Sequence, residues 1–250
     1  MVYPNYKGKH MEDALFHPEE FFAYKKFSAK FFPQKWIITF QSSVERYARR
    51  RYKLKREKDI PFHRNVPYFY KGIGFLRVIG IGSPHTIVVF EELIALGARE
   101  FIVVGTAGGL QDQGVYVCEK SIRDEGTSAH YLAHDRYALP DKKLTAQLES
   151  SLLKAGVPFQ RGVSWTIDAP YRETKAEIQK YKKEGVSCVE MEASALFVVA
   201  RFRKVRVAAV FVVSDVVGEE KWEPNFDDKH IRGLLNKSLD AAVMCFRRVY

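Results

Sequence analysis

The sequence predicts one α/β domain built on a mixed, largely parallel twisted sheet that is flanked by helices. Short apolar runs rich in β-branched residues, such as Trp36–Phe40 and Val205–Val213, are typical of buried strands. Amphipathic stretches of helical period separate these runs along the chain. Because no internal repeat or low-complexity linker interrupts this alternation, we expect a single sheet covered by helices on both faces.

The individual helices and strands are predicted from local patterns of apolar, polar and capping residues. Residues 1–35 are rich in aromatic and charged side chains, and we expect a helical lead-in there, followed by one compact unit at residues 36–250. Ser83 and Pro84 predict the N-cap and first residue of a helix. Strands are predicted at Trp36–Phe40, Phe75–Ile79, Phe101–Val104, Val115–Ser121, Gly162–Ile167 and Val205–Val213. Helices are predicted after Ser42 and at Thr86–Leu96, Lys142–Ala155, Lys175–Lys183, Ala193–Phe202 and Asp227–Arg248.

The composition excludes several classes of protein. With 46% apolar residues the chain can bury a core, which excludes disorder. The first ten residues contain no apolar stretch of the kind that forms a signal peptide, and no run is long enough to cross a membrane. The cysteines Cys118, Cys188 and Cys245 are too far apart to suggest a zinc knuckle or a disulfide framework. We therefore expect a cytoplasmic protein without a membrane partner.

The charge of the chain is unevenly distributed. Forty basic residues against 30 acidic ones give a net charge of +10, which favours anionic partners. Much of this excess lies between Arg46 and Lys58. The stretch could be a nucleic-acid or phosphate patch, but a solvated helix face followed by a loop is the favoured interpretation, so a nucleic-acid partner is not expected.

A glycine-rich segment, Gly105–Gly109, follows the strand predicted at Phe101–Val104. Glycines allow backbone amides to approach a ligand closely, and the Thr106 hydroxyl adds a further donor, so the segment suits an anion. A tight turn after a strand is the alternative.

Two carboxylates flank a methionine in the segment Glu190-Met191-Glu192, which precedes an apolar helix. A carboxylate here can accept hydrogen bonds from the two vicinal hydroxyls of a ribose, while methionine packs against the sugar. The alternative is that these acids cap the following helix.

Asp215 follows Ser214 at the end of the apolar run Val205–Val213. A carboxyl group at the end of a buried strand is costly unless it is hydrogen-bonded or functional. Desolvation would raise its pKa and allow it to donate a proton as a general acid. The alternative is an acid that caps the next element.

Together these segments resemble the nucleoside phosphorylase superfamily, which includes uridine phosphorylases, purine nucleoside phosphorylases and methylthioadenosine nucleosidases. The resemblance runs from about Trp36 to the C-terminal helix and identifies residues 36–250 as a catalytic domain. The segments that carry it, in family order and spacing, are Gly80–Leu93, Val104–Leu110, Val189–Ala193 and Val213–Asp215.

The resemblance implies a role for each motif. Arg46, Thr106 and the amides around Gly105 and Gly108 are expected to bind phosphate. Glu190, Met191 and Glu192 are expected to bind ribose, with Glu192 holding the 2′- and 3′-hydroxyls. Asp215 is expected to contact the base and protonate N7 of a leaving purine, and Trp165 or Tyr171 to stack on that base.

Two departures from the family pattern leave the second substrate open. Gln41–Arg46 replaces the usual Gly-Asp-Pro loop but retains an arginine, and Val103 stands where a phosphate arginine is usual. Arg64 of a neighbouring subunit is a candidate substitute. Alternatively, Glu45 could activate water, as the glutamate of the family's nucleosidases does, although Ser42 and Glu45 also have the spacing of a capping box.

The predicted reaction is phosphorolysis of a nucleoside, with purine favoured, which gives free base and ribose 1-phosphate. Inorganic phosphate is the expected co-substrate, and no cofactor or metal is expected, since His130 and His134 lack a surrounding metal motif. The alternatives are a hydrolytic nucleosidase, a uridine phosphorylase, or a nucleic-acid-binding module that uses residues 46–58. The resemblance also implies a homo-oligomer, a dimer or a hexamer, with shared active sites.

Overall fold

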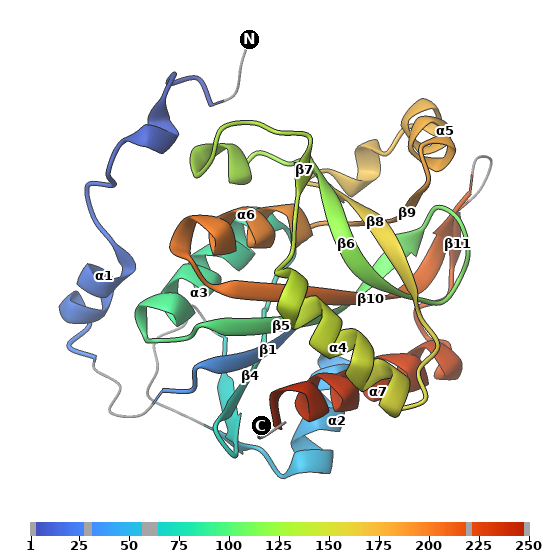
Figure 1. Ribbon diagram of the computed structural model, residues 1–250, viewed down its shortest axis with the longest axis horizontal. Helices are drawn as coiled ribbons and strands as arrows, with labels where there is room; N and C mark the ends of the chain where they lie inside the picture. The colour runs from blue at the N-terminus through green and yellow to red at the C-terminus, as the bar shows by residue number, and fades with distance from the viewer. Residues whose placement is uncertain (1–3, 28–31, 57–64, 219–221, 248–250) are drawn as a thin grey trace.

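The computed structural model describes residues 4–27, 32–56, 65–218 and 222–247, and it confirms the predicted α/β class. Four parallel strands lie at its centre in the order β10-β5-β1-β4 (Figure 1). Their runs of buried side chains fit a sheet that is covered on both faces. These strands are β1 (Lys35–Thr39), β4 (Ile73–Arg77), β5 (Glu100–Gly109) and β10 (Arg206–Val217).

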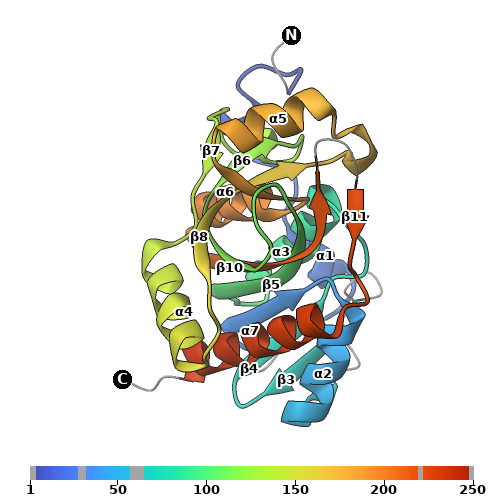
Figure 2. The same cartoon turned by 90° about the vertical axis from the view of Figure 1, so that its right-hand side faces the viewer.

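Helices cover the two faces of these strands with separate apolar clusters. Along β1, Trp36 and Ile38 belong to one cluster and Ile37 to the other, as the alternation of side chains in a strand requires. Both views place α4 and α7 side by side on one face (Figures 1 and 2). The first face is covered by α3 (Ser83–Ala95) and α6 (Ala193–Arg203), and the second by α2 (Ser42–Tyr52), α4 (Lys142–Lys154) and α7 (Lys229–Arg247).

Part of the sheet closes on itself. The strand β10 pairs with β5 on one side and antiparallel with β6 on the other, and parallel ladders then lead from β6 to β8 and from β8 to β9. An antiparallel ladder from β9 back to β5 completes the ring. The sequence did not predict this closure, because it depends on ladders between distant segments. The added strands are β6 (Val115–Asp124), β8 (Gln160–Ile167) and β9 (Val186–Glu190).

The remaining elements lie at the edges. In the N-terminal segment, α1 packs beside α3 through the buried Phe22. The helix α5 packs over a third apolar cluster, which lies against β8 and β9. Within the described ranges, no helix is both long and apolar enough to cross a membrane. These elements are η1 (Lys9–Met11), α1 (Pro18–Tyr24), β2 (Lys55–Arg56), β3 (Pro67–Tyr70), η2 (Ser128–His130), β7 (Tyr137–Ala138), η3 (Pro170–Arg172), α5 (Lys175–Lys183) and β11 (Trp222–Pro224).

The segment Gly105–Gly109 is strand and not the tight turn that glycine content suggested, because β5 continues alongside β10 as far as Gly109. The glycine at 108 is required by close packing. A Cβ atom at Gly108 would lie 2.8 Å from Val217 and 3.1 Å from Val189. The motif therefore allows three strands to meet closely, which positions the residues described below.

Candidate active site

A cavity of about 690 Å³ opens where β1, β5, β9 and β10 end, a volume typical of small-ligand sites. The strand β1 pairs with β5 as far as Val103, and β9 pairs with β5 from Gly108. The cavity opens along the stretch of β5 between them. This is the carboxyl-terminal edge of the parallel strands, where ligands bind in open α/β sheets.

All four sequence motifs contribute to the wall of this cavity. The first contributes Ile81, the second Thr106 to Gly108, the third Glu190 to Glu192 and the fourth Ser214 and Asp215. Segments that are far apart in sequence therefore form one site, as the sequence predicted. Gly105 is buried behind this wall and is not among the lining residues.

Glu192 lies at the junction of β9 and α6, and its carboxylate is nearly buried. Its Oε1 accepts a hydrogen bond of 2.7 Å from the Gly82 amide. Burial, with a smaller contribution from the charge of Glu190, raises the pKa of Glu192 to about 8. A carboxyl group with this pKa is strongly desolvated, and hydroxyl donors from a ligand would stabilise its ionised form.

The start of α3 is tied to the same junction. The Ser83 hydroxyl donates to the Met191 carbonyl oxygen at 2.8 Å. The predicted N-cap at Ser83 is wrong by one residue, since Gly82 is the N-cap, with a φ of 92° that favours glycine. Pro84 lies in the first turn, as expected. These contacts connect Met191 and Glu192 to α3.

The carboxylate of Glu190, which was predicted to contact ribose, is occupied by donors of the protein itself. The backbone amides of Glu192 and Ala193 donate to its Oε2 at 2.8 and 2.6 Å. The Thr166 and Ser164 hydroxyls donate to its Oε1 at 2.5 and 3.1 Å. The carboxylate is thus occupied in holding the start of α6, which is the capping alternative. Burial raises the pKa of Glu190, and these donors partly oppose that shift.

Asp215 lies within β10 and not beyond its end, at an irregularity in the ladder with β5. Ser214 donates to its Oδ1 and Trp222 Nε1 to its Oδ2, both at 2.8 Å. Trp222 reaches it because β11 folds back antiparallel on β10, which pairs Asp215 with Pro224. The carboxylate is therefore fixed from both sides while it lines the cavity.

Trp222 and Phe226 line the cavity, and sequence reasoning did not identify them. Their rings are 5.8 Å apart, and both are more than half exposed. Exposed aromatic rings in a cavity suit a flat heterocycle. The sequence feature that could have pointed to Trp222 is its position in a polar segment shortly after Ser214 and Asp215.

The prediction that Trp165 stacks on the base is wrong, because this residue does not line the cavity. Its side chain is fully buried, packs on Tyr181 with a ring separation of 4.7 Å, and donates to Asp124 at 2.9 Å. It is a core residue and cannot stack on a base. Tyr171 is fully exposed and does line the cavity.

The segment from η3 to the first residue of α5 brings two further charged side chains into the wall, Glu173 and Lys175. Sequence reasoning missed both. Burial, followed by the charges of Asp215 and Glu177, raises the pKa of Glu173 to about 7.

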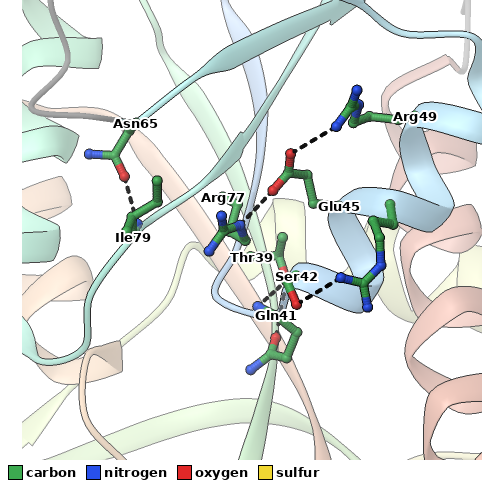
Figure 3. A network of polar contacts seen from close by, with 9 residues as sticks. Thr39, Gln41, Ser42, Glu45, Arg49, Asn65, Arg77 and Ile79 are labelled. Atoms are coloured by element: carbon green, nitrogen blue, oxygen red, sulfur yellow. Dashed lines mark hydrogen bonds and ion pairs between the residues drawn. The ribbon is translucent and has the colours of Figure 1, made fainter.

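Polar side chains connect the ends of β1 and β5 beside the cavity, and Figure 3 shows two of them, Thr39 and Gln41. The Thr39 hydroxyl donates to Gln41 Oε1 at 3.1 Å, and Gln41 Nε2 donates to the Thr106 hydroxyl at 2.9 Å. Because the Thr106 oxygen accepts this bond, its own proton is available for a ligand. This end of the cavity offers neutral hydrogen-bond donors.

The charged residues of the first loop lie elsewhere. Glu45 accepts a 2.5 Å hydrogen bond from Arg77 Nε and lies 3.8 Å from Arg49 Nη1 (Figure 3). Arg46 is exposed, donates to the Ser42 hydroxyl at 3.3 Å, and does not line the cavity. The predicted capping box is also wrong, because α2 begins at Ser42 with Gln41 as its N-cap.

Positive charge is scarce in the wall. Among the described lining residues, Lys175 is the one cation. Val103 is buried in β5, and Arg64 and Lys58 lie outside the described residues. Within those residues, no group of three or more histidine, cysteine, aspartate or glutamate side chains could hold a metal ion.

Comparison with known proteins identifies the fold and the family. Residues 40–243 match the family model described as the phosphorylase superfamily. The chain is 31% identical to a purine nucleoside phosphorylase of Plasmodium vivax over 66% of this chain and 71% of that protein. It is 37% identical to a uridine phosphorylase of Treponema pallidum over 54% of this chain and 58% of that protein.

Solved structures share the architecture. A purine nucleoside phosphorylase from Toxoplasma gondii, in complex with immucillin-H, matches with a TM-score of 0.75 at 20% identity, over 88% of this chain and 93% of that one. An AMP nucleosidase from Bacteroides thetaiotaomicron matches with a TM-score of 0.73 at 20% identity, over 93% and 99%. Since the family model covers most of the sequence and the predicted motifs converge in one cavity, the chain belongs to the phosphorylase superfamily.

Proposed function

We propose that this protein cleaves the N-glycosidic bond of a purine nucleoside and transfers the ribose to inorganic phosphate. The observation that carries the proposal is that Glu192, Asp215 and Thr106 line one cavity. They supply the three groups that this reaction needs: an acceptor for ribose hydroxyls, an acid for the base and a donor for the nucleophile. The purine nucleoside phosphorylase of Plasmodium vivax, at 31% identity, supports the choice of substrate.

At the ribose end, the carboxylate of Glu192 accepts the 2′- and 3′-hydroxyls while Met191 packs against the sugar. The Gly82 amide holds the carboxylate in place at 2.7 Å, so its orientation is set before the substrate binds. This preorganisation reduces the entropic cost of orienting the sugar.

At the base end, Asp215 transfers a proton to N7 of the purine as the bond from C1′ to N9 breaks. The electron pair of that bond passes to the base, and the sugar acquires oxocarbenium character. A proton on the leaving base and an anion close to C1′ both stabilise this transition state. Trp222 orients Asp215 through its Nε1 donor and offers its ring to the base.

At the nucleophile end, phosphate would accept hydrogen bonds from Thr106, from Gln41 and from the backbone of β5 near Gly108. We propose that a neighbouring subunit of a homo-oligomer supplies the cation that this end lacks among the described lining residues of one chain. Arg64 is the candidate from the sequence.

The test is to incubate the purified protein with inosine, adenosine, guanosine, methylthioadenosine and uridine, each with and without phosphate, and to measure free base. The proposal predicts base release from a purine nucleoside that requires phosphate and yields ribose 1-phosphate. Preferential cleavage of uridine, or no cleavage of any nucleoside, would contradict it.

Hydrolysis is the second candidate, and one observation favours it. Within the described residues, neutral donors and no arginine form the end of the cavity around Gln41 and Thr106. Such a site can hold a water molecule without phosphate. The AMP nucleosidase among the similar structures shares the fold. Base release at the same rate with and without phosphate would establish this candidate and remove phosphorolysis.

A further inference from the structure

Glu173 lies in the wall of the cavity that contains Asp215, on the loop between η3 and α5. Its backbone amide donates to the Pro170 carbonyl oxygen at 3.4 Å, which helps to fix the loop. No described side chain or amide donates a hydrogen bond to its carboxyl group. Glu173 is therefore half-buried in a ligand cavity with its hydrogen-bonding capacity available.

The charged groups around Glu173 come from two elements. Asp215 on β10 and Glu177 on α5 are acidic, and Lys175 on α5 is basic and lines the same cavity. The carboxyl group of Asp215 already accepts hydrogen bonds from Ser214 and Trp222, whereas that of Glu173 has no such described donor. The two carboxyl groups thus have different environments, which assigns them different roles.

Burial and the charge of Asp215 raise the pKa of Glu173 to about 7. Below this pH the group is mostly neutral, and its O–H can donate a hydrogen bond. Above it the group is a carboxylate that can only accept. Glu173 therefore changes from donor to acceptor within the physiological pH range.

The chemistry of purines gives this change a consequence. N7 and the substituent at C6 lie on the same edge of the ring, so a group beside the acid that addresses N7 can reach the 6-position. A 6-oxo group accepts hydrogen bonds, whereas a 6-amino group donates them. We propose that Glu173 reads the 6-position of the bound purine, favouring 6-oxopurines when it is protonated and 6-aminopurines when it is ionised. This inference rests on the proposed function, because it takes Asp215 to address N7.

The experiment measures dissociation constants of hypoxanthine and adenine for the wild-type protein between pH 6 and pH 8, by calorimetry or by tryptophan fluorescence. The expected result is that the preference for hypoxanthine over adenine falls by about tenfold across this range, since one hydrogen bond to a charged or neutral carboxyl group is exchanged. A ratio that does not change with pH would overturn the inference.

The variant Glu173→Gln supplies the decisive comparison. Its amide both donates and accepts at every pH, so the ratio of the two dissociation constants should become independent of pH. Glu119→Gln, at an exposed position on β6 outside the cavity, is the matched control and should retain the wild-type response. Circular dichroism confirms that each variant is folded. A wild-type response in Glu173→Gln would overturn the inference.

The two proposals fail separately. A ratio that is flat with pH, in a protein that cleaves purine nucleosides, removes the role of Glu173 and leaves the proposed function intact. A ratio that changes with pH, in a protein that cleaves no nucleoside, supports the role of Glu173 in base recognition and removes the proposed function.

Discussion

The two ends of the cavity differ in how their charged residues are positioned. At the base and ribose end, Asp215 lies within β10 and Glu192 lies between β9 and α6. Their carboxyl groups accept hydrogen bonds from Trp222 and from the Gly82 amide, respectively. At the end nearest β1, the neutral Gln41 lines the cavity, while the neighbouring charged residues lie on the surface of α2. Side chains within or next to strands are therefore positioned by the strand registers. The long charged side chains on the surface of α2 can instead bind any of several neighbouring groups.

The largest expected effect is at the base end. Asp215→Asn removes the proton donor, and we expect kcat for a purine nucleoside to fall by at least about 100-fold, as is typical when a general acid is lost. The steady-state rate of base release at saturating nucleoside and phosphate checks this. Ser214→Ala, which removes one donor to Asp215, should have a smaller effect. An Asp215→Asn variant with the full rate would remove Asp215 as the acid.

The second prediction concerns Glu190, whose role is to stabilise the fold, in contrast to the ligand-binding role proposed for Glu192. Glu190→Gln replaces an acceptor that receives two amides and three hydroxyls, so at least one of these donors loses its partner. We expect the free energy of unfolding to fall by about 2 kcal/mol. Urea unfolding measures this. An unchanged stability would show that Glu190 does not hold the start of α6.

The third prediction concerns Glu192 and pH. In the folded protein its pKa is raised to about 8, so the folded state retains a proton that the unfolded chain loses near its ordinary value of about 4.3. The contribution of this group to stability is therefore complete at low pH and is lost as pH rises towards 8. In Glu192→Gln we expect the decline in unfolding free energy between pH 5 and pH 8 to be smaller by about 3 to 4 kcal/mol.

The matched measurement is urea unfolding of wild type and Glu192→Gln at both pH values. The same variant should bind nucleoside more weakly, because an amide offers one acceptor oxygen where the carboxylate offers two and carries no negative charge. A pH dependence of stability identical to that of the wild type would show that Glu192 does not titrate in the folded protein as described.

The smallest expected effect is at the first loop. Arg46 is exposed and outside the wall of the cavity, so Arg46→Ala should change kcat/KM by less than about twofold, within the range of surface substitutions. Gln41→Ala removes a donor at the cavity and should reduce kcat/KM by about tenfold. If Arg46→Ala proves the more damaging substitution, the difference between the two ends of the cavity does not hold in solution.

Much of this molecule could be predicted from its sequence. The alternating patterns located most of the central strands and helices, because burial on one or two faces determines those patterns. That Glu192 and Asp215 line the same cavity was also predictable, since motifs at strand ends converge in such folds. The closure of the ring and the extension of β5 through Gly109 were not predictable, because they depend on ladders between distant segments.

The errors have a common physical origin. Trp165 and Glu190 were assigned by residue type and position, but the strand register turned the first into the core and the second towards the start of α6. Glu45 forms an ion pair with Arg77 on β4, and the spacing of these two residues in the sequence does not predict that contact. Trp222 and Glu173 were missed because they lie in segments without a periodic pattern.

The most direct test of the proposed active site is a crystal structure of Asp215→Asn with inosine and phosphate, since slow turnover would preserve the substrate. We expect the ribose hydroxyls at Glu192, the base against residue 215 and the Trp222 ring, which together line the cavity, and the phosphate at Thr106. A nucleoside bound elsewhere, or bound with its base at Thr106, would contradict the assignment of the cavity.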